Sequence, residues 1–222
     1  YLAHGRIVSV DKEEALQSEG VVAIYTAEDL LADGVKPLPV ADKYFRVDGE
    51  PMAQPAWYAL AKGVVHYVGE AVVAVVAESQ AQAVDAAQLV DIEYDELPAA
   101  GNLAAASAPG APLVWEDAPN NIVAQKTFGD EAAVAEAFAA AHHITKLELT
   151  NNRLVGNAME PRTVICEFDK NSGRRTIRIG HQHPHGLLDS LKKIFGESRE
   201  KFRVMVEDIG GGFGVKAMTY PE

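Results

Sequence analysis

A glycine-rich run near residue 210 is the first place to look for chemistry. Residues 210–216 read GGGFGVK. Glycine has no Cβ, so the run permits positive φ angles and close approach of backbone N–H groups to an anion, at about 0.5–1 kcal/mol per residue. The run lacks the last glycine of a dinucleotide fingerprint and the Ser or Thr that follows a P-loop lysine. It fits either a ligand loop or a plain glycine-rich turn.

A second set of polar residues lies about thirty residues upstream. His181, Gln182, His183 and His185 surround the start of a predicted helix over 184–196. Proline is harmless at the first helical position, and a glycine can cap the end. The helix is indicated by Pro184, by apolar residues at helical spacing and by Gly196, the apolar residues being Leu187, Leu188, Leu191 and Ile194.

The three histidines alternate as strand ligands of a metal would. Pro184 breaks the alternation, so the imidazoles need not share a face. We therefore predict no metal site made by protein ligands. Gln182 alone would be read as a polar residue beside the helix.

Strands must position these residues. The sequence predicts strands over 162–169, 175–180 and 201–208, and the last of these leads into the glycines. Cys166, the only cysteine, has apolar neighbours that predict a buried structural thiol. A lone cysteine excludes an internal disulfide and a cysteine-ligated iron–sulfur cluster within this chain.

The first part of the chain predicts a small separate domain. Candidate strands lie at 6–11, 21–26, 65–78 and 90–98, and Ser79 begins a helix with Gln82 at the capping-box position. Residues 99–121 are rich in Ala, Pro, Gly and Asn and predict a linker. Strands and helices are expected to resume at Ile122, with a helix over 130–141.

The overall charge limits the partners. The chain has 20 basic and 32 acidic residues and a net charge of −12. This balance favours solubility and argues against nucleic acid or an anionic membrane as partner. We also find no apolar stretch near the roughly 18 residues that span a bilayer.

Three segments in order resemble the molybdopterin-binding large subunit of the xanthine dehydrogenase, aldehyde oxidase and carbon monoxide dehydrogenase family. They are NNRLVGNAMEPR (151–162), HQHPHGLLDSL (181–191) and EDIGGGFGVKAMTYPE (207–222). Residues 67–79 and 85–99 resemble the α/β hammerhead domain of that family. The resemblance implies an α+β chain: a hammerhead domain over 1–98, the linker 99–121, and the truncated start of a molybdopterin-binding α/β domain over 122–222.

The resemblance also implies site residues. The glutamine before the helix hydrogen-bonds an oxo ligand of molybdenum in that family, and Gln182 holds its place. Gly211, Gly212, Phe213 and Gly214 would contact the cofactor, molybdenum–molybdopterin as the cytosine dinucleotide, with Phe213 beside the substrate channel. Ala217 stands where some branches carry an acid that contacts substrate, which weighs against a xanthine-like purine.

The implied reaction is oxidation of aldehydes, N-heterocycles or carbon monoxide with oxygen taken from water. The family's glutamate base lies beyond the position of Glu222, so no catalytic residue is assigned here, and Glu160, Glu207 and Asp208 are interpreted as structural. We expect an N-terminal fragment, inactive alone. We expect a cytoplasmic location. The N-terminus is expected to be incomplete, so the sequence does not exclude periplasmic export.

The implied partners are the iron–sulfur and FAD subunits of a hydroxylase complex, assembled as a dimer of heterotrimers, and a small-molecule substrate. The alternative is a non-catalytic assembly module. In that case the hammerhead domain would bind a partner subunit, and the glycine loop would be vestigial.

Overall fold

The first part of the chain forms two small antiparallel sheets. The computed structural model describes residues 2–40, 44–46, 48–152 and 154–222. One sheet has the strand order β3-β1-β5 and the other pairs β2 with β4. These strands are β1 (Gly5–Asp11), β2 (Val21–Tyr25), β3 (Val64–Val65), β4 (Ala74–Ala77) and β5 (Asp91–Glu96).

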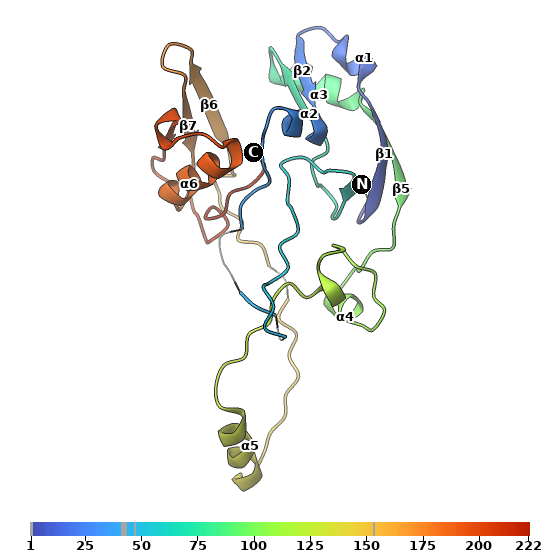
Figure 1. Cartoon of the computed structure of the whole chain (residues 1–222), viewed down its shortest axis with the longest axis vertical. Helices are drawn as coiled ribbons and strands as arrows, with labels where there is room; N and C mark the ends of the chain where they lie inside the picture. Colours follow the sequence, from blue (N-terminus) through green and yellow to red (C-terminus); the bar gives the residue numbers. More distant parts are fainter. Residues whose placement is uncertain (1, 41–43, 47, 153) are drawn as a thin grey trace.

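Short helices connect and cover these strands (Figure 1). They are α1 (Glu13–Leu16), α2 (Ala27–Ala32) and α3 (Gln80–Gln88). Ser79 caps α3 as predicted, because its hydroxyl accepts the Gln82 N–H at 3.3 Å. Ala86 of α3 is fully buried. The core of this part is built by Ala61, Val65 and Val72, with partly buried neighbours such as Ile7, Val10, Ile92 and Tyr94 around them.

The single strand expected over 65–78 is wrong. It is two strands in different sheets, β3 and β4, because the chain turns between them. Gly69 has φ +90°, and the N–H of Glu70 bonds to the carbonyl of Tyr67 at 3.2 Å. A positive φ ends an extended run, and the apolar pattern on either side does not reveal it.

The last part of the chain holds the sheet that matters for the site. It has the order β6-β7-β8, where β6 (Val164–Asp169) is antiparallel to β7 (Arg174–Ile179) and β7 is parallel to β8 (Phe202–Met205). The crossover from β7 to β8 is made by α6 (Pro184–Phe195) and a 3-10 turn, η2 (Arg199–Lys201). Leu187 and Ile194 of α6 are buried, as are Ile177 and Phe202 of the sheet.

Helix α6 follows its sequence signals. Pro184 occupies the first turn, and Gly196 ends the helix with φ +65° in the left-handed conformation. Residue 36 meets this end, because the Lys36 N–H donates to the carbonyl of Ile194 at 2.8 Å. This bond fastens the first part of the chain to α6.

Between the two parts the chain is irregular. It contains α4 (Leu103–Ala106), η1 (Pro119–Asn121) and α5 (Glu131–Ala140). Figure 1 shows α5 at the far end of two long extended segments, away from every sheet. The expectation that strands resume at Ile122 is wrong: among the described residues the first strand after it begins at Val164. No residue of α5 is buried. The helix therefore packs on no sheet that could hold the segments beside it as strands.

The expected burial of Cys166 is also wrong. Its side chain is exposed on β6, which among the described strands pairs with β7 alone and so forms an edge of the sheet. The apolar residues beside it still raise the pKa of its thiol by desolvation. Across the described ranges, no helix is long and apolar enough to cross a membrane.

Candidate functional site

The candidate site lies where two parallel strands end. β7 leads into residues 180–183 and β8 leads into residues 210–214. Because β7 and β8 are parallel neighbours, their carboxyl ends open at the same edge of the sheet, the usual place for ligands in such sheets. The segment 156–160 approaches the same edge, since the Glu160 N–H donates to the carbonyl of Gly210 at 3.3 Å.

Gln182 and the glycine loop lie in direct contact. The side-chain oxygen of Gln182 accepts the N–H of Gly214 at 2.9 Å, and the backbone N–H of Gln182 donates to the carbonyl of Lys216 at 2.9 Å. The structure therefore brings together all five predicted site residues, Gln182, Gly211, Gly212, Phe213 and Gly214.

Two glycines of the loop adopt backbone conformations that favour glycine, and a third leaves no room for a side chain. Gly211 has φ +101° and Gly214 has φ +83°. A Cβ on Gly212 would lie 2.5 Å from the Cδ of Gln182. Phe213 adopts φ +51° despite its side chain, which is 74% exposed. The loop thus holds an aromatic ring outward in a conformation that phenylalanine rarely adopts.

Three hydrogen-bond donors of the site lack a protein acceptor. The N–H groups of Gly212 and Phe213 and the side-chain NH2 of Gln182 donate to none of the residues that the structure describes. Three neutral donors, two on the glycine loop and one on the adjacent Gln182, suit an anionic, oxygen-rich ligand. The residues therefore fit the phosphate and oxygen groups of a metal–pterin cofactor.

An ion pair that the sequence did not predict lies beneath the loop. Lys216 is buried, with 2% of its side chain exposed, and its Nζ donates to Oε2 of Glu160 at 2.6 Å. The same oxygen accepts the Gly210 N–H at 2.9 Å. Lys216 and this N–H lower the pKa of Glu160. The only signal in the sequence was a lysine between apolar residues after the glycines, which needs a carboxylate if it is buried.

His181 has a structural role in this arrangement. Its side chain is buried, and its Nδ1 accepts the His183 N–H at 2.9 Å. Nε2 must then carry the proton and donate to the carbonyl of Met218 at 3.2 Å. Burial lowers the pKa of His181, which keeps the ring neutral. Within the described residues, no three His, Cys, Asp or Glu side chains converge as metal ligands.

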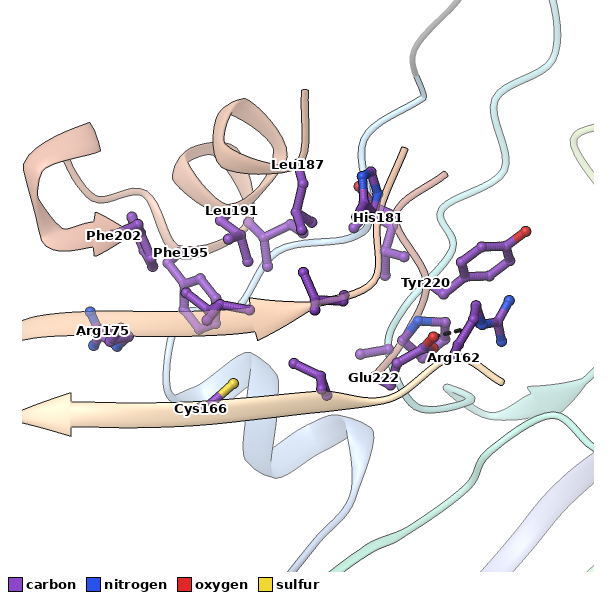
Figure 2. A pocket seen from close by; sticks show the side chains of 18 of the residues that line it. Arg162, Cys166, Arg175, His181, Leu187, Leu191, Phe195, Phe202, Tyr220 and Glu222 are labelled. Carbon is purple, nitrogen blue, oxygen red and sulfur yellow. Dashed lines mark ion pairs between the residues drawn. The ribbon is translucent and has the colours of Figure 1, made fainter. Parts of the chain in front are cut away.

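An apolar cavity of about 420 Å³ lies behind the site, between α6 and the strands β6 and β7. Figure 2 shows Leu187, Leu191 and Phe195 of α6 facing it, with Cys166 on the opposite wall. At one end Arg162 pairs with Glu222 at 2.7 Å and lies 3.6 Å above the ring of Tyr220.

Comparison with known proteins gives a consistent result over the whole chain. The family description "Aldehyde oxidase and xanthine dehydrogenase, a/b hammerhead domain" matches residues 1–98, and "Molybdopterin cofactor-binding domain" matches residues 114–222. The nicotine 6-hydroxylase large subunit of Paenarthrobacter nicotinovorans is 33% identical over 99% of this chain and 26% of its own length. The carbon monoxide dehydrogenase large chain of Hydrogenophaga pseudoflava is 32% identical over 99% of this chain and 28% of its own.

A solved structure agrees with the sequence comparisons. The crystal structure of quinoline 2-oxidoreductase from Pseudomonas putida 86 superposes with a TM-score of 0.85 and 29% identity, over 99% of this chain and 27% of that one. The chain thus spans about a quarter of the length of the relatives it matches. It belongs to the family of molybdenum hydroxylase large subunits that includes aldehyde oxidase, xanthine dehydrogenase and carbon monoxide dehydrogenase.

Proposed function

We propose that this chain forms the first domains of a molybdenum hydroxylase large subunit, and that Gln182 and residues 211–214 form one wall of its molybdopterin pocket. The observation that carries the proposal is the set of three donors without a protein acceptor, all presented by the glycine loop and Gln182. In this proposal the hammerhead domain spans 1–98, the linker 99–121 and the start of the cofactor domain 122–222.

The residues of this chain would bind and orient the cofactor. The side-chain NH2 of Gln182 would donate to an oxygen at the metal, and the N–H groups of Gly212 and Phe213 would donate to neighbouring oxygens. When bound, the cofactor supplies the redox centre that oxidises aldehydes, N-heterocycles or carbon monoxide with oxygen from water. The exposed ring of Phe213 would border the space for substrate.

A proton-abstracting base is not assigned to this part of the enzyme. The carboxylate of Glu160 is held by Lys216 and by the N–H of Gly210, and its lowered pKa makes it a poor base. We therefore propose that residues 1–222 alone are inactive and that the base comes from another part of the large subunit.

The further parts of the proposal follow from the family. The pterin would be the cytosine dinucleotide, and FAD and 2Fe-2S clusters would lie on partner subunits in a dimer of heterotrimers. Cys166 alone provides no cluster ligand set. We propose a cytoplasmic location for the assembled complex.

The test is cofactor content. The protein would be purified as its host expresses it, with its partner subunits, and molybdenum would be measured by elemental analysis and pterin by fluorescence. We expect Gly212→Val to lose both, because the added side chain meets Gln182. Gln182→Ala should retain more cofactor than Gly212→Val and lose turnover.

Gly101→Val is the matched control, because a Cβ there meets nothing within 4 Å. It should keep the cofactor content of the parent. A parent protein free of molybdenum and pterin would overturn the proposal and leave the assembly module.

A further inference from the structure

We propose that Lys216 and Glu160 are the positioning residues of the glycine loop: the ion pair between the buried Lys216 and the partly exposed Glu160 fixes where Gln182 and the turn 211–214 present their donors. The identity of the ligand rests on the function proposed above. The positioning itself is a property of this chain and is tested separately.

Lys216 connects all three segments of the site. Its side chain reaches Glu160, and its carbonyl accepts the N–H of Gln182 at 2.9 Å. Its own backbone N–H donates to the carbonyl of Gly212 at 3.4 Å. A displacement of Lys216 would therefore move the glycine turn and Gln182 together.

Glu160 fits a space that two glycines leave open. A Cβ on Gly210 would lie 2.6 Å from the Cβ of Glu160, and a Cβ on Gly180 would lie 3.1 Å from its Oε2. Gly180 directly follows β7, and Gly210 lies five positions after the end of β8. The carboxylate thus lies between the ends of two parallel strands and bonds to the second through the N–H of Gly210.

No neighbouring residue that the structure describes can readily take the place of either member of this ion pair. A buried ammonium group requires a partner, because water cannot solvate it. Lys216 is 2% exposed, and among the described residues Glu160 is its only ion-pair partner. Nearby cations are engaged elsewhere: Arg162 pairs with Glu222, and Arg178 lies 3.7 Å from Glu167 and 3.8 Å from Glu207.

The first test follows amide protection in cofactor-free protein, using the variants Glu160→Gln, Lys216→Met and the double variant. The reporter is the Gly214 N–H, which bonds to Gln182 and touches neither member of the pair. We expect its hydrogen–deuterium exchange to accelerate by about tenfold or more in all three variants. The double variant leaves no charge unpaired, and Lys216→Met leaves only the Glu160 carboxylate, whose side chain is 41% exposed to water. Both variants therefore keep the test valid if Glu160→Gln does not fold.

Glu207→Gln is the matched control. It removes the same charge beside the same loop from a side chain that is 83% exposed, and the Gly214 amide should exchange as in the parent. Unchanged exchange in Lys216→Met and the double variant would overturn the inference. An equal loss of protection throughout α6 and the sheet would also overturn it, because the pair would then only stabilise the fold.

The second test follows the loaded protein. We expect Lys216→Met to lower molybdenum content and to alter the electron paramagnetic resonance spectrum of the molybdenum that remains, whereas Glu207→Gln does neither. An unaltered spectrum at full occupancy would count against positioning of Gln182. If the parent contains no molybdenum or pterin, the proposed function fails. The positioning role is then tested by the exchange rate of the Gly214 N–H alone.

Discussion

At the scale of single residues, the site contains several unusual features close together. Phe213 has φ +51°, Lys216 is a buried cation and Gln182 offers an amide without a protein acceptor. The positive φ and the buried cation are each unfavourable alone, and all three features occur within one short stretch of contacts. Such a concentration is typical of a binding site.

Replacing Phe213 with glycine should stabilise the fold. The left-handed conformation costs a residue with a Cβ about 1 kcal/mol, and the exposed ring gives little packing in return. We expect Phe213→Gly to raise the free energy of unfolding in urea by up to about 1 kcal/mol. Phe128→Gly is the control, since Phe128 is 80% exposed and has no positive φ. A destabilised Phe213→Gly variant would contradict this prediction.

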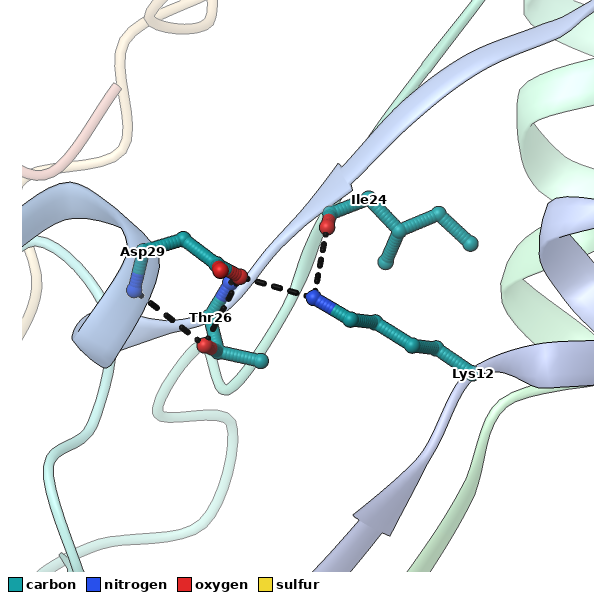
Figure 3. Close-up of polar contacts among 4 residues, drawn as sticks. All are labelled: Lys12, Ile24, Thr26 and Asp29. Carbon is teal, nitrogen blue, oxygen red and sulfur yellow. Dashed lines mark hydrogen bonds and ion pairs between the residues drawn. The ribbon is translucent and has the colours of Figure 1, made fainter. Parts of the chain in front are cut away.

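Asp29 should make part of the stability pH-dependent. Lys12 donates to Asp29 Oδ2 at 2.8 Å and to the carbonyl of Ile24 at 3.1 Å, and Asp29 closes a capping box with Thr26 (Figure 3). The bond from Lys12 and those from Thr26 lower the pKa of Asp29 to about 2. The folded-state pKa lies below the unfolded one, so this stability is present above about pH 4 and lost toward pH 2.

Asp29→Asn measures that contribution. Because Asp29 is 40% exposed, solvent screening reduces the effect, and we expect a loss on the order of 1 kcal/mol at pH 7. The difference from the parent should vanish near pH 2 in urea titrations. Asp33→Asn, at the opposite end of α2, should show no such loss. A difference that is constant with pH would show that the Asp29 charge is not involved.

At the scale of elements, α6 connects the two strands that carry the site. Pro184 starts it beside Gln182, and Gly196 stops it where Lys36 approaches. Helix α6 therefore carries the chain from the end of β7, beside Gln182, back to the start of β8, which pairs with β7 in parallel.

A change at Gly196 tests this end of α6. Gly196 has φ +65°, so Gly196→Ala should cost about 1 kcal/mol in the free energy of unfolding. Gly196→Asn should cost less, because asparagine tolerates the left-handed conformation. Equal losses for the two variants in chemical denaturation would mean that contact of the new side chain with Lys36 dominates, because a Cβ on residue 196 would lie 3.4 Å from Lys36 Nζ.

The elements also show which features the sequence could predict. Helix α6 and strands β7 and β8 were predicted because periodicity, Pro184 and Gly196 are local signals. The turn inside 65–78 and the exposed Cys166 were missed because they depend on which strands pair. Gln182 and the glycine loop were predicted as site residues from the resemblance, and this remains a prediction. The contact of Lys216 with Glu160 joins segments 56 positions apart, so no periodic pattern in the sequence reveals it.

At the scale of the whole molecule, the segment between the two parts is fastened at particular points. Trp115 stacks on His66 with ring centroids 3.5 Å apart and planes at 13°. Asn121 accepts the Val114 N–H and donates to the carbonyls of Ala106 and Pro112. Residues 102–121 are therefore held in a folded loop against the first part of the chain.

Trp115→Ala should release that loop. Loss of the stacked pair should cost about 1 kcal/mol, and proteolytic cleavage within 99–121 should become faster. Trp115→Phe retains an aromatic face and should resist cleavage more than Trp115→Ala. Equal cleavage rates for Trp115→Ala and the parent, followed by mass spectrometry, would show that Asn121 alone holds the loop.

The order of contacts along the chain has a consequence for folding. β6 and β7 are joined by a short turn, but Glu160 and Lys216 are separated by 56 positions and Gln182 and Gly214 by 32. Longer separations carry a larger closure entropy, so the hairpin should form early and the glycine loop late. During synthesis the three segments cannot meet until Lys216 has left the ribosome. We therefore expect the glycine loop and its contact with Gln182 to order last in this part of the chain, so that the proposed cofactor would bind to an already folded sheet.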